Sequence, residues 1–330
     1  VFNFEGGCYA KTIDLSEENE LRDGAVNLRY YWHIVLERRW LVLSAFLISV
    51  ILTTVLGQKI EPTYKLVSYG PHEDMTLNFW KVESKKPTPL LVHIHGGGWL
   101  GGKKLETANA NELKKRYSFA SIDYRLAGVE LLPAAVHDAA RAIQFLRTKA
   151  KEWKFDPNRI AVIGGSAGAA SSLWLAYHDD MANPMSEDPI LRQSSRVCGA
   201  VAMGGQTTLD PFLLKKKIGP ACIQHGMIWK TVGAKSIEDL MENWGQYKAL
   251  SLECSPITHV SKDDPPVFLN YGKPAPIPVI KGDGIHHAGF GRLLKERCES
   301  VGIECYLQVK EHEVPKLTKD NFLKKVFLIE

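Results

Sequence analysis

The chain has 330 residues, a formal net charge of +4 and 45% hydrophobic residues. It is too long for one small domain, and its length fits one large domain with an extension. Lysine and arginine are spread along the chain and form no block that alternates with aromatic residues. The composition therefore excludes a typical nucleic-acid-binding protein.

The six cysteines are scattered at positions 8, 198, 222, 254, 298 and 305 and form no CxxC pair. This spacing argues against a zinc ribbon or a thioredoxin-type motif and favours buried free thiols. Cys298 and Cys305 flank a predicted helix-to-strand turn. They are candidates for a disulfide bond if this part of the chain is exported.

The first 57 residues differ in composition from the rest of the chain. Residues 1–39 form a polar N-terminal segment, and residues 40–57 are 18 consecutive residues without a charge. This length predicts a transmembrane helix. Arg38 and Arg39 precede it, and the excess of basic residues on that side favours a cytoplasmic N-terminus. The alternative, a buried core helix, would normally carry a polar stripe.

From residue 64 onward strands and helices alternate, which predicts a mostly parallel sheet covered by helices on both faces. The expected strands cover residues 75–82, 89–95, 118–124, 159–163, 198–203, 267–270 and 304–309. The expected helices cover residues 106–116, 133–153, a segment from Ala167 onward, 286–300 and 318–328. Residues 207–250, with Met227, Trp229 and Trp244, are expected to form part of a small cap.

The sequence Gly-Gly-Ser-Ala-Gly at 164–168 lies between a predicted strand and a predicted helix. This G-x-S-x-G pattern is typical of a nucleophile elbow, in which a sharp turn exposes the serine hydroxyl at the edge of the sheet. The helix that follows places unpaired N–H groups where negative charge develops during acyl transfer. Ser166 is therefore the predicted nucleophile.

A second glycine-rich segment, His-Gly-Gly-Gly-Trp at 95–99, ends an earlier strand. Glycines let backbone N–H groups approach a substrate oxygen closely, so Gly96 and Gly97 are predicted to form an oxyanion hole with Ala167. The spacing also fits a phosphate-binding loop, but Lys104 stands where Ser or Thr would bind magnesium.

His93 and His95 share one face of a strand, and no third residue is spaced to complete a metal site with them. No metal or cofactor is therefore predicted. The remaining histidines, at 33, 72, 137, 178, 225 and 259, are expected to be structural.

Residues 64–330 resemble the hormone-sensitive-lipase-like branch of the α/β-hydrolases, which includes bacterial acetyl-xylan and feruloyl esterases. The matching segments are HGGGW at 95–99, DYRL at 123–126, DPNR at 156–159, GGSAG at 164–168, SPITHV at 255–260 and DPPV at 264–267. The resemblance implies an α/β-hydrolase fold and a serine, histidine and acid in that chain order.

The sequence departs from this family at the acid, because Ala275 stands where an aspartate is expected. Asp283 is the nearest carboxylate downstream and is the candidate acid. His312 follows the last strand and is the first candidate for the base. His286 and His287 are the alternative bases, and a site without a working base also remains open.

Residues 27–66 resemble the first membrane segment of bacterial polysaccharide chain-length determinant proteins. The matching text is LRYYWHIVLERRWLVL, the apolar run and the EPTY sequence at 61–64. This resemblance implies a membrane anchor in an envelope-polysaccharide setting. Together with the basic residues before the apolar run, it predicts a location in the bacterial inner membrane with the hydrolase domain on the periplasmic or outer side.

Together these features predict a membrane-anchored serine carboxylesterase that acts on a small-molecule or polysaccharide ester, such as an acetyl or feruloyl ester. The alternative is a catalytically impaired hydrolase fold that serves as a binding or scaffold module, which the missing aspartate favours. A third possibility is an anchor that oligomerises with polysaccharide-assembly partners, with esterase activity secondary. The oligomeric state is left open.

Overall fold

The computed structural model describes residues 38, 40, 41, 44, 59–109, 116–272, 277, 278 and 280–329. The chain divides into two units, residues 1–57 and 58–330, and the second unit contains the sheet and its helices. Almost all of the predicted membrane segment at 40–57 lies outside the described residues. Within the described ranges, no helix combines the length and the apolar character needed to span a membrane.

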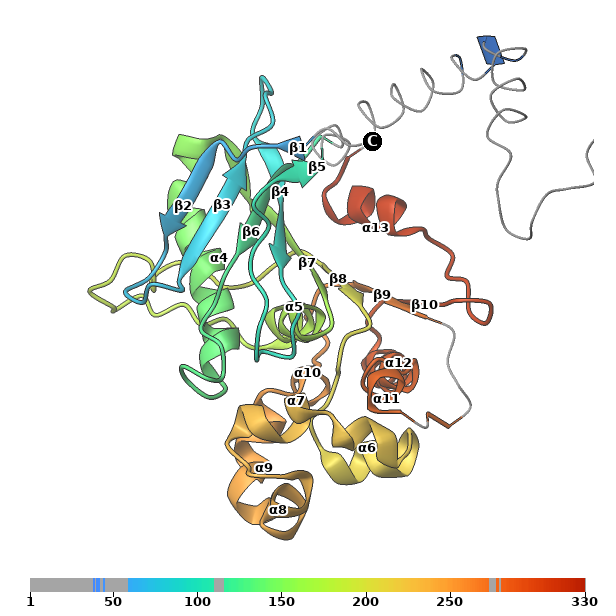
Figure 1. Ribbon diagram of the computed structural model, residues 1–330. Helices are drawn as coiled ribbons and strands as arrows, with labels where there is room; N and C mark the ends of the chain where they lie inside the picture. Colours follow the sequence, from blue (N-terminus) through green and yellow to red (C-terminus); the bar gives the residue numbers. More distant parts are fainter. Residues whose placement is uncertain are drawn as a thin grey trace, which may run out of the picture. The chain divides into compact units, whose positions relative to one another are not determined.

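An eight-stranded sheet forms the centre of the second unit (Figure 1). Its strand order is β10-β9-β8-β7-β4-β6-β3-β2, with parallel pairing from β10 to β6 and antiparallel pairing of β3 with both neighbours. The strands are β2 (Tyr64–Ser68), β3 (Thr76–Trp80), β4 (Thr88–Ile94), β6 (Ser118–Ile122), β7 (Phe155–Gly165), β8 (Ala200–Met203), β9 (Val267–Tyr271) and β10 (Cys305–Val309). The prediction of a mostly parallel sheet is confirmed.

The larger helices are α4 (Ala134–Trp153), α5 (Ala167–Tyr177), α12 (Gly289–Val301) and α13 (Lys319–Val326). A run of short helices connects β8 to β9 and gathers at one end of the sheet (Figure 1). These are α6 (Pro211–Lys217), η2 (Pro220–Gln224), α7 (Gly226–Trp229), η3 (Lys230–Val232), α8 (Ile237–Glu242), α9 (Trp244–Glu253) and α10 (Pro256–His259). Helix α11 (Lys281–Ile285) follows β9.

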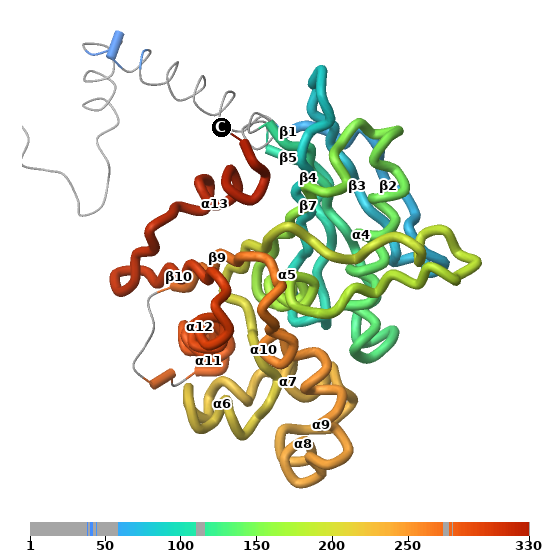
Figure 2. Tube along the Cα trace, turned by 180° about the vertical axis from the view of Figure 1, so that it is seen from behind, coloured from blue at the N-terminus to red at the C-terminus, as the bar shows by residue number. Residues whose placement is uncertain are grey.

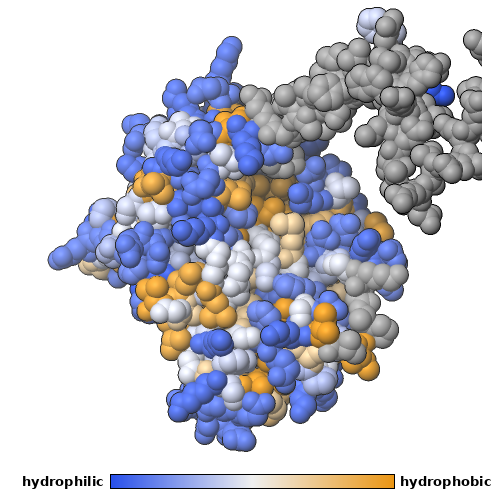
Figure 3. Space-filling model, in the orientation of Figure 1, coloured by the Kyte–Doolittle hydropathy of each residue, from blue (hydrophilic) through white to orange (hydrophobic). Residues whose placement is uncertain are grey.

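Helices cover the sheet on both faces. Successive side chains of a strand point to opposite faces, so one strand contributes to two separate cores. In β4, Leu90 and Val92 belong to the core that packs against α4, α5 and α12, whereas Leu91 belongs to a second core with residues of α13. Figures 1 and 2 show α4 and α13 on opposite sides of the sheet. On the face drawn in Figure 3, hydrophilic residues predominate and apolar residues form small separate groups.

Three sequence-based expectations differ from the structure. The helix expected at 106–116 is wrong at its start, because Ala108–Asn109 form β5 and pair antiparallel with β1 (Lys59–Ile60). Residues 110–115 lie outside the described ranges. The strand expected at 159–163 is longer and covers the whole of β7. The helix expected from 286 begins only at Gly289, so His286 and His287 lie between two helices.

The five cysteines in the described ranges are free thiols. The candidate pair of Cys298 and Cys305 is not joined in a disulfide bond. Burial raises the pKa of the Cys198 and Cys222 thiols to about 12, which keeps them protonated at neutral pH.

The nucleophile helix packs against the sheet so closely that only glycine fits at the contact. A β-carbon on Gly168 of α5 would lie 2.0 Å from the carbonyl oxygen of Ile94 at the end of β4. One on Gly164 would lie 2.3 Å from the backbone of Gly168. These two glycines therefore fix the distance between α5 and the strands beneath it.

We expect Gly168→Ala to lower the free energy of unfolding by about 3 kcal/mol, because the added methyl group overpacks a backbone-to-backbone contact. Urea denaturation monitored by circular dichroism measures this change. The matched control is Gly128→Ala, since a β-carbon there has no atom within 4 Å. Its stability should stay within about 0.5 kcal/mol of the parent, and an equal loss in both variants would contradict the packing argument.

Candidate active site

Ser166 lies in the turn that joins β7 to α5. Its backbone has φ 53° and ψ −121°, a conformation that residues other than glycine rarely adopt. Two backbone hydrogen bonds hold the turn: the Ser166 N–H donates to the Met203 carbonyl at 2.9 Å, and the Ser166 carbonyl accepts from the Ala170 N–H at 2.9 Å. The serine is half-buried. This is the geometry of a nucleophile elbow.

The loop after β4 lies against this turn. A β-carbon on Gly96 would lie 2.8 Å from the Gly165 carbonyl oxygen and 3.5 Å from Cβ of Ser166. Gly97 and Gly98 have φ values of 108° and 67°, which only glycine adopts without strain. Trp99 is fully buried, and its Nε1 donates to Oγ of Ser171 in α5 at 2.9 Å. The loop is therefore anchored to the helix that carries the nucleophile.

Ala167 is the first residue of α5. The first N–H groups of a helix have no partner within the helix and attract negative charge. Gly96 thus lies against the Ser166 turn, and Ala167 follows Ser166 directly in the chain. The assignment of Gly96, Gly97 and Ala167 as an oxyanion hole stays a prediction.

The imidazole at hydrogen-bond distance from the serine belongs to His286. Its Nε2 lies 2.9 Å from Oγ of Ser166. Its Nδ1 lies 3.1 Å from the carbonyl oxygen of Gly282 in α11. A backbone carbonyl can only accept a hydrogen bond, so Nδ1 carries the proton and the lone pair of Nε2 faces the serine hydroxyl.

His312, the first candidate for the base, lies elsewhere. It is exposed in the turn after β10, where its backbone N–H donates to the Val309 carbonyl at 3.0 Å. A backbone bridge between Val309 and Glu313 closes this turn and leaves the imidazole facing solvent. The segment after β9 therefore reaches Ser166, and the segment after β10 does not.

Asp283, the candidate acid, is exposed in the first turn of α11. Within the described part of the chain its carboxylate makes no hydrogen bond or ion pair. Ala275 lies outside the described residues, and the segment 273–276 contains no Asp or Glu. The observed partner of the His286 ring is thus an uncharged carbonyl oxygen, four residues back in the same segment.

His287, the other alternative base, is buried and supports the start of α12. Its Nδ1 accepts a hydrogen bond from the Gly289 N–H at 3.0 Å. This contact gives His287 a helix-capping role beside His286.

Gln206 is a site residue that the sequence did not indicate. Its fully buried side-chain Nε2 donates to the Ile285 carbonyl at 2.6 Å and to the Gly204 carbonyl at 3.2 Å. Ile285 precedes His286, and a β-carbon on Gly204 would lie 3.4 Å from Cδ2 of the His286 ring. One amide therefore ties together the two backbone segments that enclose the imidazole.

His225, which was expected to be structural, caps the start of α7 and also lies near the glycine loop. Its Nδ1 accepts from the Met227 N–H at 3.2 Å, and its Cε1 lies 3.5 Å from the β-carbon position of Gly98. Burial, and then the charges of His286 and Lys281, lower the pKa of His225. A neutral imidazole from the helices after β8 thus lies beside the glycine loop.

His93 and His95 each contact side chains of neighbouring segments. Nδ1 of His93 is bonded to Oγ of Ser121 at 2.9 Å, and burial lowers the pKa of His93 to about 4. The ring of His95 stacks on Tyr124 at 4.2 Å, and the Tyr124 hydroxyl donates to the His95 carbonyl at 2.8 Å. Both histidines support the end of β4.

A cavity of about 590 Å³ opens at the carboxyl ends of β8, β9 and β10, beside Gly204. Polar side chains of Asn270, Gln308 and Glu313 contribute to its lining. In a parallel sheet this edge is where ligands bind. A second cavity of about 580 Å³ is lined by residues such as His72 and Arg141. Neither Ser166 nor His286 is among the lining residues of either cavity.

The chain matches the model of the BD-FAE family over residues 78–281, which is well over half of the chain. The matched range contains the glycine loop and Ser166, and it ends before His286.

Two curated relatives are ester hydrolases of Mycobacterium tuberculosis. Carboxylesterase NlhH is 36% identical over 118 residues, which cover 34% of this chain and 36% of the relative. The probable carboxylic ester hydrolase LipM is 26% identical over 63% of this chain and 47% of the relative. The chain thus spans less than half the length of the curated relatives it matches.

Solved structures with the same fold include a truncated carbohydrate esterase from gut microbiota, with a TM-score of 0.63 at 18% identity, covering 83% of this chain and 98% of that one. The acetyl ester-xyloside bifunctional hydrolase of Caldicellulosiruptor lactoaceticus gives a TM-score of 0.58 at 20% identity, covering 78% and 89%. At these identities the likeness establishes an α/β-hydrolase fold.

We expect His286→Ala to lower kcat for an ester substrate by at least about a thousandfold, because it removes the imidazole that contacts Ser166. Steady-state hydrolysis of p-nitrophenyl acetate measures the effect. His312→Ala and Asp283→Asn are the matched controls and should keep the parent kcat. A large loss in His312→Ala together with an active His286→Ala would assign the base to the turn after β10.

We expect Gln206→Glu to lower kcat by about ten- to a hundredfold with little change in KM. A carboxylate has no donor and a protonated carboxyl has one, so at least one of the two carbonyls loses its partner and the imidazole shifts. Circular dichroism checks that the variant is folded. The same substitution at exposed Gln224 is the control. An unchanged kcat in folded Gln206→Glu would show that the amide does not position His286.

Proposed function

Because the chain belongs to the BD-FAE family, we propose that it is a serine carboxylesterase that hydrolyses small acyl esters. The observation that carries this proposal is the 2.9 Å hydrogen bond between Nε2 of His286 and Oγ of Ser166. An activated serine needs a base at this distance, and the ring here has the tautomer that accepts the hydroxyl proton.

In the proposed reaction, His286 takes the proton of Ser166 as Oγ attacks the ester carbonyl. The N–H groups of Gly96, Gly97 and Ala167 stabilise the oxyanion, and each such donor contributes about 3 kcal/mol in enzymes of this type. The protonated imidazole then gives its proton to the leaving alcohol. Water, deprotonated by the same imidazole, hydrolyses the acyl-enzyme and releases the acid.

The Gly282 carbonyl takes the orienting place that an aspartate usually has. It accepts from Nδ1 at 3.1 Å and so keeps the productive tautomer of His286. An amide in this place could instead donate and impose the wrong tautomer, whereas a carbonyl cannot. The uncharged oxygen stabilises the imidazolium less than a carboxylate would, so the missing aspartate lowers the rate without abolishing the chemistry.

The short helices after β8 are assigned as a cap over the acyl-binding side of the site. Two contacts support this assignment. His225 lies beside Gly98, and a β-carbon on Gly284 in α11 would lie 2.6 Å from the backbone nitrogen of Cys222 in η2. The helices thus contact both the glycine loop and the segment that carries the base.

The proposed substrate class is a carbohydrate ester, such as an acetyl or feruloyl ester on a polysaccharide. Support comes from the names of two structural neighbours, a carbohydrate esterase and an acetyl ester-xyloside hydrolase.

The proposal includes attachment to the bacterial inner membrane through residues 40–57, with the hydrolase domain on the periplasmic side. The uncharged run of 18 residues and the arginines before it support this part. Membrane fractionation of the full chain and of a chain that lacks residues 1–57 tests it, and equal solubility of the two would refute the anchor.

We expect the purified chain to hydrolyse p-nitrophenyl acetate faster than the octanoate and to be labelled by a fluorophosphonate probe at Ser166. Ser166→Ala should lose both signals, because the attacking oxygen is gone. Mass spectrometry of the labelled peptide identifies the modified residue.

A folded chain that neither turns over the ester nor reacts with the probe would favour the alternative of a catalytically impaired binding or scaffold module. Activity that persists in Ser166→Ala would contradict the assignment of the nucleophile.

A further inference from the structure

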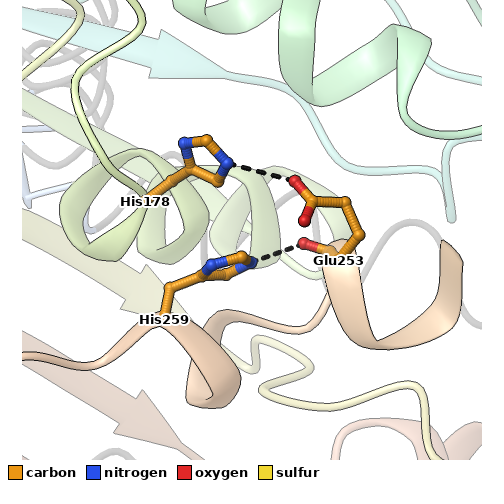
Figure 4. A group of neighbouring side chains, drawn as sticks. All are labelled: His178, Glu253 and His259. Carbon is orange, nitrogen blue, oxygen red and sulfur yellow. Dashed lines mark hydrogen bonds and ion pairs between the residues drawn. The ribbon is translucent and has the colours of Figure 1, made fainter. Parts of the chain in front are cut away.

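A cluster of side chains that can bind a metal ion lies apart from Ser166 and His286. It consists of His178, Glu253 and His259, whose ligand atoms all lie within 4.8 Å of one another (Figure 4). From these residues we propose a surface binding site for a divalent transition-metal ion, with Zn²⁺ as the reference metal. This inference concerns metal binding and does not rest on ester hydrolysis.

The hydrogen bonds of His178 point to a cation. Its Nδ1 lies 2.9 Å from the carbonyl oxygen of Asp179, and its Nε2 lies 3.1 Å from Oε1 of Glu253. Both partners are acceptors, and a neutral imidazole has one N–H to donate. The second nitrogen is therefore satisfied only when a positive ion, a proton or a metal, lies between it and the carboxylate.

The contacts of His178 match the usual surroundings of a metal-binding histidine, in which one ring nitrogen binds the metal and the other donates to a backbone carbonyl. In His178 the Asp179 carbonyl takes the Nδ1 proton. In His259 one ring nitrogen, Nε2, lies 2.6 Å from the Glu253 carbonyl. The same carbonyl accepts from Nε1 of Trp174 at 2.9 Å, so it is held firmly in place.

The surrounding backbone also favours a cation. His178 is the residue that caps the C-terminal end of α5, Glu253 is the last residue of α9 and His259 is the last residue of α10. The carbonyl groups at a helix C-terminus give it partial negative charge. Figure 4 shows the three side chains pointing toward one another from these helix ends.

The geometry can close around a metal with small side-chain movements. Zinc-bound nitrogens and oxygens at about 2.0–2.1 Å in a tetrahedron stand roughly 3.3 Å apart, compared with at most 4.8 Å here. The Glu253 side chain is 40% exposed and that of His178 is 20% exposed. The carboxylate is thus free to turn, and solvent can supply the fourth ligand. Two imidazoles with one carboxylate are ligands that zinc accepts.

The test uses the full chain treated with EDTA and dialysed, titrated with Zn²⁺ in an isothermal calorimeter. We expect one equivalent to bind. Glu253→Gln and His259→Gln should each weaken binding at least about tenfold. Loss of a residue that only hydrogen-bonds a ligand already lowers metal affinity about tenfold or more, and loss of the ligand itself should lower it at least as much. Glu253→Gln keeps the backbone carbonyl and changes only a partly exposed side chain, so it serves as the variant least able to disturb the fold.

The matched control is His72→Gln. His72 faces Asp74 at 3.5 Å on the surface, and among the described residues this pair belongs to no three-ligand group. Its loss should leave the affinity unchanged. Zn²⁺ should also raise the Tm of the parent and of His72→Gln, but not of Glu253→Gln, because the ion links α5 to α9 and binds only the folded chain. Absence of stoichiometric binding, or parent-like affinity in folded Glu253→Gln, would overturn the proposal.

Discussion

The turn at Ser166 is the constraint around which the rest of the site is arranged. Its positive φ costs on the order of 1–3 kcal/mol, and a conformation of this cost persists only when its surroundings over-determine it. Here β8 accepts the serine N–H, and Gly164 and Gly168 allow α5 to press against β4. The same close packing places Gly96 beside Ser166, directly before the first residue of α5. The strained turn, the glycine loop and the nucleophile helix are thus held together by one set of backbone contacts.

Features that depend on neighbouring residues were predictable from the sequence. The elbow at 164–168 and the glycine loop at 95–99 each consist of five consecutive residues, so the local residue pattern is enough to predict their turns. Continuous apolar runs predicted the buried parallel strands for the same reason. The exception is the segment at 108–109, where pairing with Lys59–Ile60, far away in the sequence, overrides a local helical pattern.

Features that depend on distant contacts were not predictable. His286 lies 120 residues from Ser166, and no local pattern distinguishes it from His312 as the base. Gln206 gains its importance only because folding places Ile285 beside it, 79 residues away. The histidine–glutamate cluster spans 75 residues between His178 and Glu253, so its members look like unrelated structural side chains in the sequence. In each case tertiary packing, rather than spacing, creates the chemistry.

The pairing of His286 with the Gly282 carbonyl has a mechanical consequence. The imidazole and its orienting acceptor belong to one short stretch of backbone, whereas in a serine–histidine–aspartate triad they come from separate loops. A displacement of this stretch would carry both groups together and preserve the proton on Nδ1. Alignment with the hydroxyl could then be broken and restored as a rigid-body step, without a change of tautomer. In such a site, hydrolytic competence depends on the docking of a single peptide segment.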